Sequence, residues 1–197
     1  QLAAGAGSSI FAGNVSGLSA GFSGSAVLSS DQPIVATLVQ VSTGSGTAVK
    51  NRPLSNGFSS GDARVLIPTT LKERFSQTTR FSVQNASSGN ADITVKFFNA
   101  DAGGALAHTI NLVNVPAGSA RYVDLGTVAA LPANFNGSAT AEGVVSGTSN
   151  PAALVASALE LGTASTYAAA FEGVSGGAAK VYMPSAPCNA FGGQNTA

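Results

Sequence analysis

The chain repeats part of its own sequence. Residues 3–27, AAGAGSSIFAGNVSGLSAGFSGSAV, align without a gap on residues 116–140, PAGSARYVDLGTVAALPANFNGSAT, with roughly ten of about twenty-five positions identical. Past one short gap the match resumes, with residues 31–41 aligned on 149–161 and residues 46–68 on 162–184. A period of about 115 residues is the size of one independent domain and far longer than a solenoid unit.

The period predicts three segments. Residues 1–61 form the C-terminal part of a first repeat, residues 62–177 a complete repeat, and residues 178–197 the opening of a further one. Phe75 aligns with Phe191, which extends the match into the last segment. The sequence leaves open whether these residues are a processed subunit or a window from a longer chain of repeats.

Composition narrows the classes of partner. Charged residues make up 9% of the chain, with nine basic and nine acidic side chains, against a usual share of about 25%. We expect no nucleic acid partner, because no basic face is available to neutralise phosphates. No run of 18 or more apolar residues occurs, so we expect no membrane-spanning segment.

The complete repeat has the pattern of an all-β domain. Short runs alternate apolar and polar residues and are separated by turn residues such as NADAGG at residues 99–104. We expect strands at residues 64–67, 80–84, 92–98, 105–113, 120–125, 138–145, 152–161 and 165–171. This spacing predicts a Greek-key β-sandwich of the Ig-like type.

The first, partial copy predicts strands at residues 9–12, 23–29 and 34–41, followed by a loop through residue 60 that has room for one short strand. The alanine content of residues 152–158 also fits a helix. Their counterpart at residues 34–41 is β-branched, which favours strands in both copies.

Several phrases of the repeat occur in a fixed order. They are VLIP or VYMP, RFSVQN, VKFFNADAGG, VPAGSARYVDL, LPANFNGSA and NPAALVASALELG. In this order they resemble tandem Ig-like repeats of secreted bacterial surface proteins. The resemblance implies an extracellular or cell-surface β-sandwich that forms arrays or adheres, and it transfers no activity or ligand residue. The chain departs from the pattern at LKERFSQ and PSAPCNAFGGQ, which puts any shared role of that connector in doubt.

We expect no catalytic residues, no metal site and no cofactor. His108 is the sole histidine and fits a structural role beside Leu106 and Ile110, because a zinc site needs several nitrogen or sulfur ligands. Serines are abundant, but no G-x-S-x-G elbow or ordered Ser/His/Asp set stands out among them.

The acidic side chains give no clear site either. Asn99, Asp101 and Asp92 have the oxygen atoms that calcium prefers, but a hairpin turn explains them. The remaining candidates are too scattered to be paired as an acid and a base, namely Asp124, Glu142 and Glu160.

Two kinds of modification remain open. Asn14, Asn85 and Asn136 each begin an N-x-[ST] sequon. Cys188 is the sole cysteine, so it has no partner within the chain and is a candidate for a thiol link between chains.

The phase of the repeat suggests self-association. A sandwich that lacks its first strands exposes sheet edges and apolar faces, and residues 178–197 resemble the strand that the beginning lacks. We therefore expect a structural, non-enzymatic subunit of a filament or surface layer, which binds copies of itself head to tail by strand addition. The hairpin equivalent to residues 92–113 is absent from both ends.

Two alternatives remain. One is an adhesive or carbohydrate-binding surface module, although the absence of tryptophan and the presence of three tyrosines disfavour a sugar-stacking surface. The other is an accessory domain of a larger secreted protein.

Overall fold

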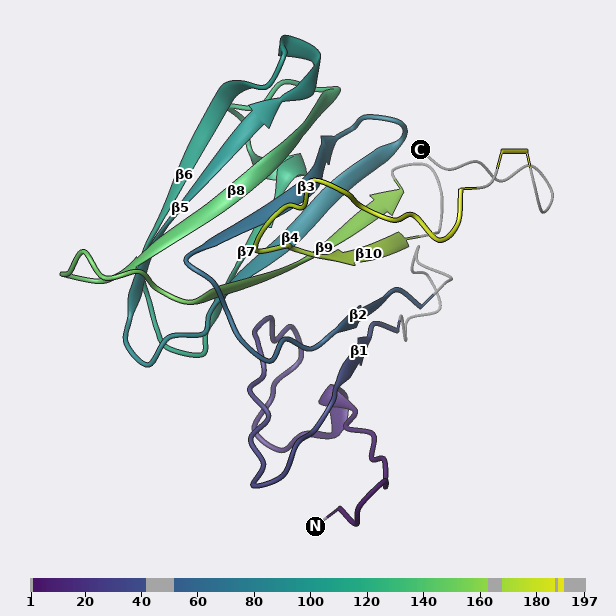
Figure 1. The fold of residues 1–197 in the computed structure, drawn as a ribbon, viewed down its shortest axis with the longest axis vertical. Helices are drawn as coiled ribbons and strands as arrows, with labels where there is room; N and C mark the ends of the chain where they lie inside the picture. Colours follow the sequence, from purple (N-terminus) through teal and green to yellow (C-terminus); the bar gives the residue numbers. More distant parts are fainter. Residues whose placement is uncertain (1, 42–51, 163–167, 187, 190–197) are drawn as a thin grey trace.

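The computed structural model describes residues 2–41, 52–162, 168–186 and 188–189 (Figure 1). In this part of the chain the protein is all-β, with antiparallel sheets and three single-turn 3-10 helices. The strands are β1 (Thr37–Val39), β2 (Leu54–Asn56), β3 (Arg64–Lys72), β4 (Gln77–Asn85), β5 (Ala91–Asn99), β6 (Ala105–Val115), β7 (Ala120–Asp124), β8 (Phe135–Val145), β9 (Leu154–Gly162) and β10 (Ala168–Glu172). The 3-10 turns are η1 (Ala12–Asn14), η2 (Ala100–Ala102) and η3 (Leu125–Thr127).

Strands β3 to β10 form two four-stranded sheets, which we call the central domain. The first sheet has the order β3-β8-β5-β6 and the second the order β10-β9-β4-β7. Alternate side chains of β5 are buried, as the sequence pattern predicts. Both sheets contribute to one core, in which the rings of Phe81 and Phe97 lie 6.1 Å apart.

The third sheet is the small ribbon β1-β2. It belongs to residues 2–41 and 52–61, which we call the N-terminal segment. In Figure 1 this segment lies below the central domain, with β2 nearest to β10. One bond between them is donated by the backbone N–H of Asn56 to Oε1 of Glu172, at 2.5 Å.

The strands predicted from residue 64 to residue 161 are each observed, as β3 to β9. The predicted strand at 165–171 falls partly outside the described residues, which show β10 from Ala168. Strand β3 continues beyond Pro68, where the prediction ended it. Its pairing with β8 shifts register between Ile67 and Thr70, and such a bulge tolerates a residue that cannot donate a backbone hydrogen bond.

The predictions for the first copy were mostly wrong. Residues 9–12 and 23–29 form no strand, and the predicted strand 34–41 is reduced to β1. A strand needs a hydrogen-bonded neighbour to persist, and within the described structure no strand pairs through its backbone with residues 9–12 or 23–29. The expected short strand in the following loop is present as β2.

The core predicts that substitution by alanine lowers the free energy of unfolding much more at one apolar position than at another. Phe97 is fully buried and Leu106 is exposed. Replacing Phe97 with alanine leaves a cavity, and we expect the free energy of unfolding to fall by about 3–5 kcal/mol. Leu106→Ala is the matched control, with an expected change within about 0.5 kcal/mol. Urea unfolding followed by circular dichroism measures both, and equal losses would contradict this assignment of the core.

Candidate functional site

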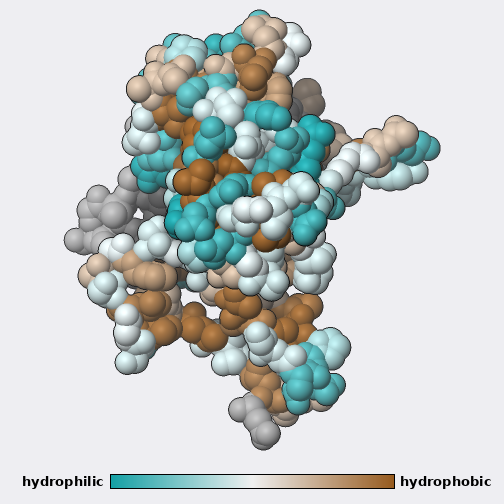
Figure 2. Space-filling model, turned by 90° about the vertical axis from the view of Figure 1, so that its left-hand side faces the viewer, coloured by the Kyte–Doolittle hydropathy of each residue, from teal (hydrophilic) through white to brown (hydrophobic). Residues whose placement is uncertain are grey.

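Apolar side chains are exposed along the N-terminal segment. Figure 2 shows brown apolar atoms gathered in the lower part of the molecule, where Figure 1 places this segment. The large exposed residues between positions 2 and 41 are Leu2, Ile10, Phe11, Val15, Leu18, Phe22, Val27, Leu28, Ile34, Val35, Leu38, Val39 and Val41. Exposed apolar side chains gathered in one region are typical of an interaction site.

The aligned residues of the central domain are buried. The pairs, with exposed fractions, are Ile10 (72%) and Val123 (5%), Leu18 (37%) and Leu131 (1%), and Phe22 (56%) and Phe135 (2%). The same residue types therefore form a core in one copy and a surface in the other.

The backbone of the two copies is nevertheless alike. Turn η1 aligns with η3 at the separation of about 113 residues. The corresponding hydrogen bonds are Val15 N–H to Ala12 O (3.1 Å) and Val128 N–H to Leu125 O (3.2 Å), then Leu18 N–H to Val15 O (3.2 Å) and Leu131 N–H to Val128 O (3.1 Å). Local sequence thus sets the same turn in both places.

The likeness continues to the phenylalanine that follows. Gly21 and its counterpart Asn134 both have positive φ, at 84° and 62°. The ring of Phe22 covers Gly24 so closely that a Cβ there would clash with it, and the ring of Phe135 covers Gly137 in the same way. At Gly137 the backbone oxygen of Phe98 also blocks a Cβ, so glycine is required there, whereas at Gly24 the exposed ring of Phe22 can move aside.

The ribbon β1-β2 reproduces the pairing of β9 with β10. Its register is Thr37–Asn56, Leu38–Ser55 and Val39–Leu54, and the aligned pairs of the central domain are Ser157–Glu172, Ala158–Phe171 and Leu159–Ala170. Beyond the ribbon, the N–H of Gly57 donates to Ala36 O at 2.8 Å, and the N–H of Gly173 donates to Ala156 O at 2.8 Å.

One neighbour differs between these two places. A Cβ at Gly173 would meet Val65 of β3 as well as Ala156, whereas a Cβ at Gly57 would meet Ala36 alone. The position that Val65 occupies beside Gly173 therefore has no equivalent beside Gly57. Within the described part of the chain, the N-terminal segment therefore shares turns and ribbon register with residues 125–173, but no strand takes the place of β3 beside Gly57.

Polar contacts hold the N-terminal segment along β7. The hydroxyl of Ser25 donates to Gly118 O at 2.7 Å, and the hydroxyl of Tyr122 donates to Gly24 O at 2.6 Å. Residues 22–27 and 117–121 line a shallow hollow between them. These bonds occupy the carbonyl of Gly24, and the N–H of Phe22 donates to Ser19 O at 3.1 Å, whereas residues 26–29 make no backbone–backbone hydrogen bond within the described structure.

The C-terminal tail, residues 178–197, is described at positions 178–186 and 188–189. Val181, Tyr182 and Met183 are strongly exposed, with exposed fractions of 71%, 80% and 67%. Cys188 is exposed with an unpaired thiol, so the proposed link between chains through this residue stays a prediction. Phe191 lies outside the described residues.

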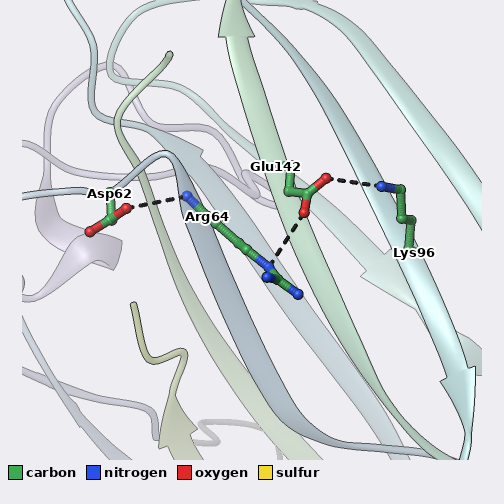
Figure 3. Close-up of polar contacts among 4 residues, drawn as sticks. All are labelled: Asp62, Arg64, Lys96 and Glu142. Carbon is green, nitrogen blue, oxygen red and sulfur yellow. Dashed lines mark hydrogen bonds and ion pairs between the residues drawn. The ribbon is translucent and has the colours of Figure 1, made fainter. Parts of the chain in front are cut away.

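Charged side chains on the first sheet form a cross-strand network (Figure 3). Glu142 on β8 lies 3.3 Å from Arg64 Nε on β3 and 2.9 Å from Lys96 Nζ on β5. The N–H of Arg64 also donates to Asp62 at 3.4 Å. Each of the two ion pairs contributes about 0.2–1 kcal/mol, and together they link β3, β8 and β5.

The other carboxylates considered from sequence lie apart from this network. Asp124 accepts from Arg80 Nε at 2.7 Å across β4 and β7. Glu160 is half-buried on β9, and burial raises the pKa of its carboxyl group. Both strands belong to the second sheet, whereas Glu142 belongs to the first.

The calcium candidates are divided between the two ends of β5. Asn99 Oδ1 accepts from the N–H of Asp101 at 2.9 Å and caps the hairpin turn. At the other end, hydrogen bonds from Asn114 N–H and the Ser146 hydroxyl lower the pKa of Asp92. Among the described residues, no group of three or more His, Cys, Asp or Glu could hold a metal ion.

His108 lies on β6 directly opposite Phe97. It is half-buried, and its ring stacks on that of Phe97 with centroids 6.3 Å apart. The half-buried Ile110 follows it, whereas Leu106 is exposed. The imidazole therefore packs at the rim of the core.

The three sequons lie in different environments. Asn14 is exposed at the end of η1, and Asn136 donates from Nδ2 to Asp101 at 3.2 Å near the surface. Asn85 is fully buried, and its Nδ2 donates to Gly89 O at 2.8 Å and Val115 O at 2.9 Å. A glycan on Asn85 would displace both bonds, which disfavours this sequon in the folded domain.

Comparisons with known proteins give little further information. No family model and no curated protein matches the chain. A solved structure described as the crystal structure of Thermotoga maritima 1070 is similar over 58% of this chain and 94% of its own, with 14% identity and a TM-score of 0.43. This similarity is too weak to carry an argument. In the described part of the chain, no helix is long and apolar enough to cross a membrane.

Asn85 is expected to be essential for stability, although sequence indicated it only as a sequon. Besides the two donated bonds, its Oδ1 accepts from the N–H of Ser87 at 2.9 Å. Asn85→Ala would leave buried groups unpaired, each at a cost of about 1–3 kcal/mol, so we expect a loss of about 2–4 kcal/mol. Asn136→Ala is the control, with a change within about 0.5 kcal/mol. Equal losses in thermal or urea unfolding would contradict this role.

Glu160 is expected to make stability depend on pH. Its pKa is raised in the folded state, so its contribution to stability is lost as pH rises from its ordinary pKa to the raised one. Glu160→Gln should therefore be more stable than the wild type at pH 7, and the difference should disappear near pH 3, at which carboxyl groups are protonated. Unfolding curves at both pH values test this, with the exposed Glu73→Gln as the control. A difference that does not change with pH would contradict the assignment.

Proposed function

We propose that the chain is a structural subunit of an extracellular bacterial assembly, a filament or surface layer built from tandem Ig-like repeats. The observation that carries this proposal is the N-terminal segment. It has the turns and the ribbon register of residues 125–173, yet its aligned apolar side chains are exposed. Covering that surface with a strand from another subunit removes apolar area from water and stabilises both partners.

The topology of the central domain supports an Ig-like repeat. Strand β4 pairs with β7 and β5 pairs with β8, as strands B and E and strands C and F do in immunoglobulin domains. The neighbours differ: β9 lies beside β4, and β3 lies beside β8. In this arrangement the first strand of the repeat completes the sheet that contains β8.

Strand addition explains how the C-terminal tail of one copy would bind the N-terminal segment of another. The tail aligns with the beginning of β3, and its apolar residues are exposed. When the tail of one copy enters the N-terminal segment of the next, each copy both gives and receives a strand. Such heterologous contacts continue without closure and produce a filament. The mode requires neither a catalytic residue nor a cofactor.

Removing residues 178–197 tests this proposal. We expect the truncated chain to stay monomeric. It should keep the folded central domain, because the bridge between Leu66 and Val174 precedes residue 178 and is retained. Light scattering and negative-stain electron microscopy measure assembly, and circular dichroism checks the fold. Removal of residues 190–197 alone is the control and should preserve assembly. A chain without residues 178–197 that still polymerises would exclude strand addition by the tail.

A further inference from the structure

The tail repeats the sequence of β3 closely. Residues 180–184 read KVYMP and align with RVLIP at residues 64–68, at a separation of about 116. The aligned pairs, with exposed fractions, are Val65 (3%) and Val181 (71%), and Ile67 (1%) and Met183 (67%). The tail therefore carries a β3-like sequence that forms no strand in the described structure.

Strand β3 has a neighbour on each side. It pairs with β8 through Val65–Ala141, Leu66–Thr140 and Ile67–Ala139. On its other side, the N–H of Leu66 donates to Val174 O at 2.7 Å, and the N–H of Val174 donates to Leu66 O at 2.9 Å. A β3-like strand thus fits between a β8-like strand and a residue equivalent to Val174.

The N-terminal segment contains both equivalents. Residues 22–29 align with residues 135–142 of β8, and Phe58 aligns with Val174. Val27, Leu28 and Phe58 have large exposed surfaces. No strand pairs with residues 22–29 within the described part of the chain.

We propose that residues 180–183 of one copy insert between residues 26–29 and Phe58 of a second copy. This inference rests on the proposed function and names the acceptor and its register. The opposed pairs, taken from the pairing of β3 with β8, are Lys180–Ser29, Val181–Leu28, Tyr182–Val27 and Met183–Ala26. The backbone of Tyr182 bonds to that of Phe58, as Leu66 bonds to Val174.

A second copy fits this acceptor better than the chain's own tail. Val174, which precedes the tail, is held to Leu66 in the central domain. In Figure 1 the tail leaves the central domain to the right above β10, whereas residues 2–35 lie to the left of β1 and β2 and below them. The acceptor precedes the central domain in the chain, and the tail follows it. When the tail of one copy binds the acceptor of the next copy, the order of the repeats therefore continues from copy to copy.

The Tyr182–Val27 pair is the best suited to a disulfide cross-linking test of the register. Because the backbone groups of Leu66 point to Val174, the pair Leu66–Thr140 is not hydrogen-bonded across β3 and β8. Cα atoms in such pairs are about 4.5 Å apart, which lies within the range of a disulfide. Met183 is next in sequence, but its side chain points to the other face of the strand.

The experiment uses full-length chains that carry Cys188→Ser, so that the native thiol is absent. One protein carries Val27→Cys and a size tag, and a second carries Tyr182→Cys. The two are mixed in a glutathione redox buffer and separated on a non-reducing denaturing gel. We expect a disulfide-linked heterodimer, and several-fold less when Met183→Cys replaces Tyr182→Cys. Excess peptide AAKVYMPSA (residues 178–186) should suppress the product, whereas a scrambled peptide should not.

The other outcomes each overturn part of the inference. Equal cross-linking of the two cysteine pairs would overturn the register. A single chain with both Val27→Cys and Tyr182→Cys that closes into a cross-linked monomer would overturn the choice of a second copy. Wild-type chains that assemble, in the absence of the heterodimer, would exclude this acceptor and leave the proposed function standing. Wild-type chains that remain monomeric in light scattering would overturn both.

Discussion

The pairing of β3 with β8 determines which apolar side chains of a repeat reach the core. It places Val65 and Ile67 opposite the small buried residues Ala141 and Ala139, so that the sheet closes over the facing strands. In the described N-terminal segment no strands take the places of β3, β4 and β5. The local turns still form there, but side chains such as Leu18 and Phe22 remain exposed. Hydrogen bonds within a turn are satisfied locally, whereas burial requires a second layer.

The sequence predicted the central domain well because its signals are local. Alternation in β5 and the NADAGG turn each depend on a few neighbouring residues, and both are observed. The interior role of Asn85 was not predictable in this way. Its partners, Val115 O and Gly89 O, come from different loops and strands, and only the three-dimensional arrangement brings them together.

In the first copy, by contrast, local signals predicted strands that did not form. Its sequence resembles strands β7 to β10, and on that basis strands were predicted at residues 9–12 and 23–29. The alignment preserved the turn at η1 and the register of the ribbon β1-β2, because these need only their own residues. Strands 9–12 and 23–29 did not form, because their neighbours in the sheet are supplied by β3, β4 and β5 in the central domain. Pattern alone does not report whether a partner strand exists.

The strand addition that we propose also requires that the other sheet edges be unfavourable for pairing with an incoming strand. Strand β6 is a long edge of the first sheet with exposed Leu106 and Val113. Its pairing with β5 is irregular near both ends, and Asn114 has a φ of 52°. Such breaks twist an edge away from the straight register that an added strand needs. No residue from 22 to 29 has a positive φ, so the strand addition that we propose would meet a straighter backbone there than at β6.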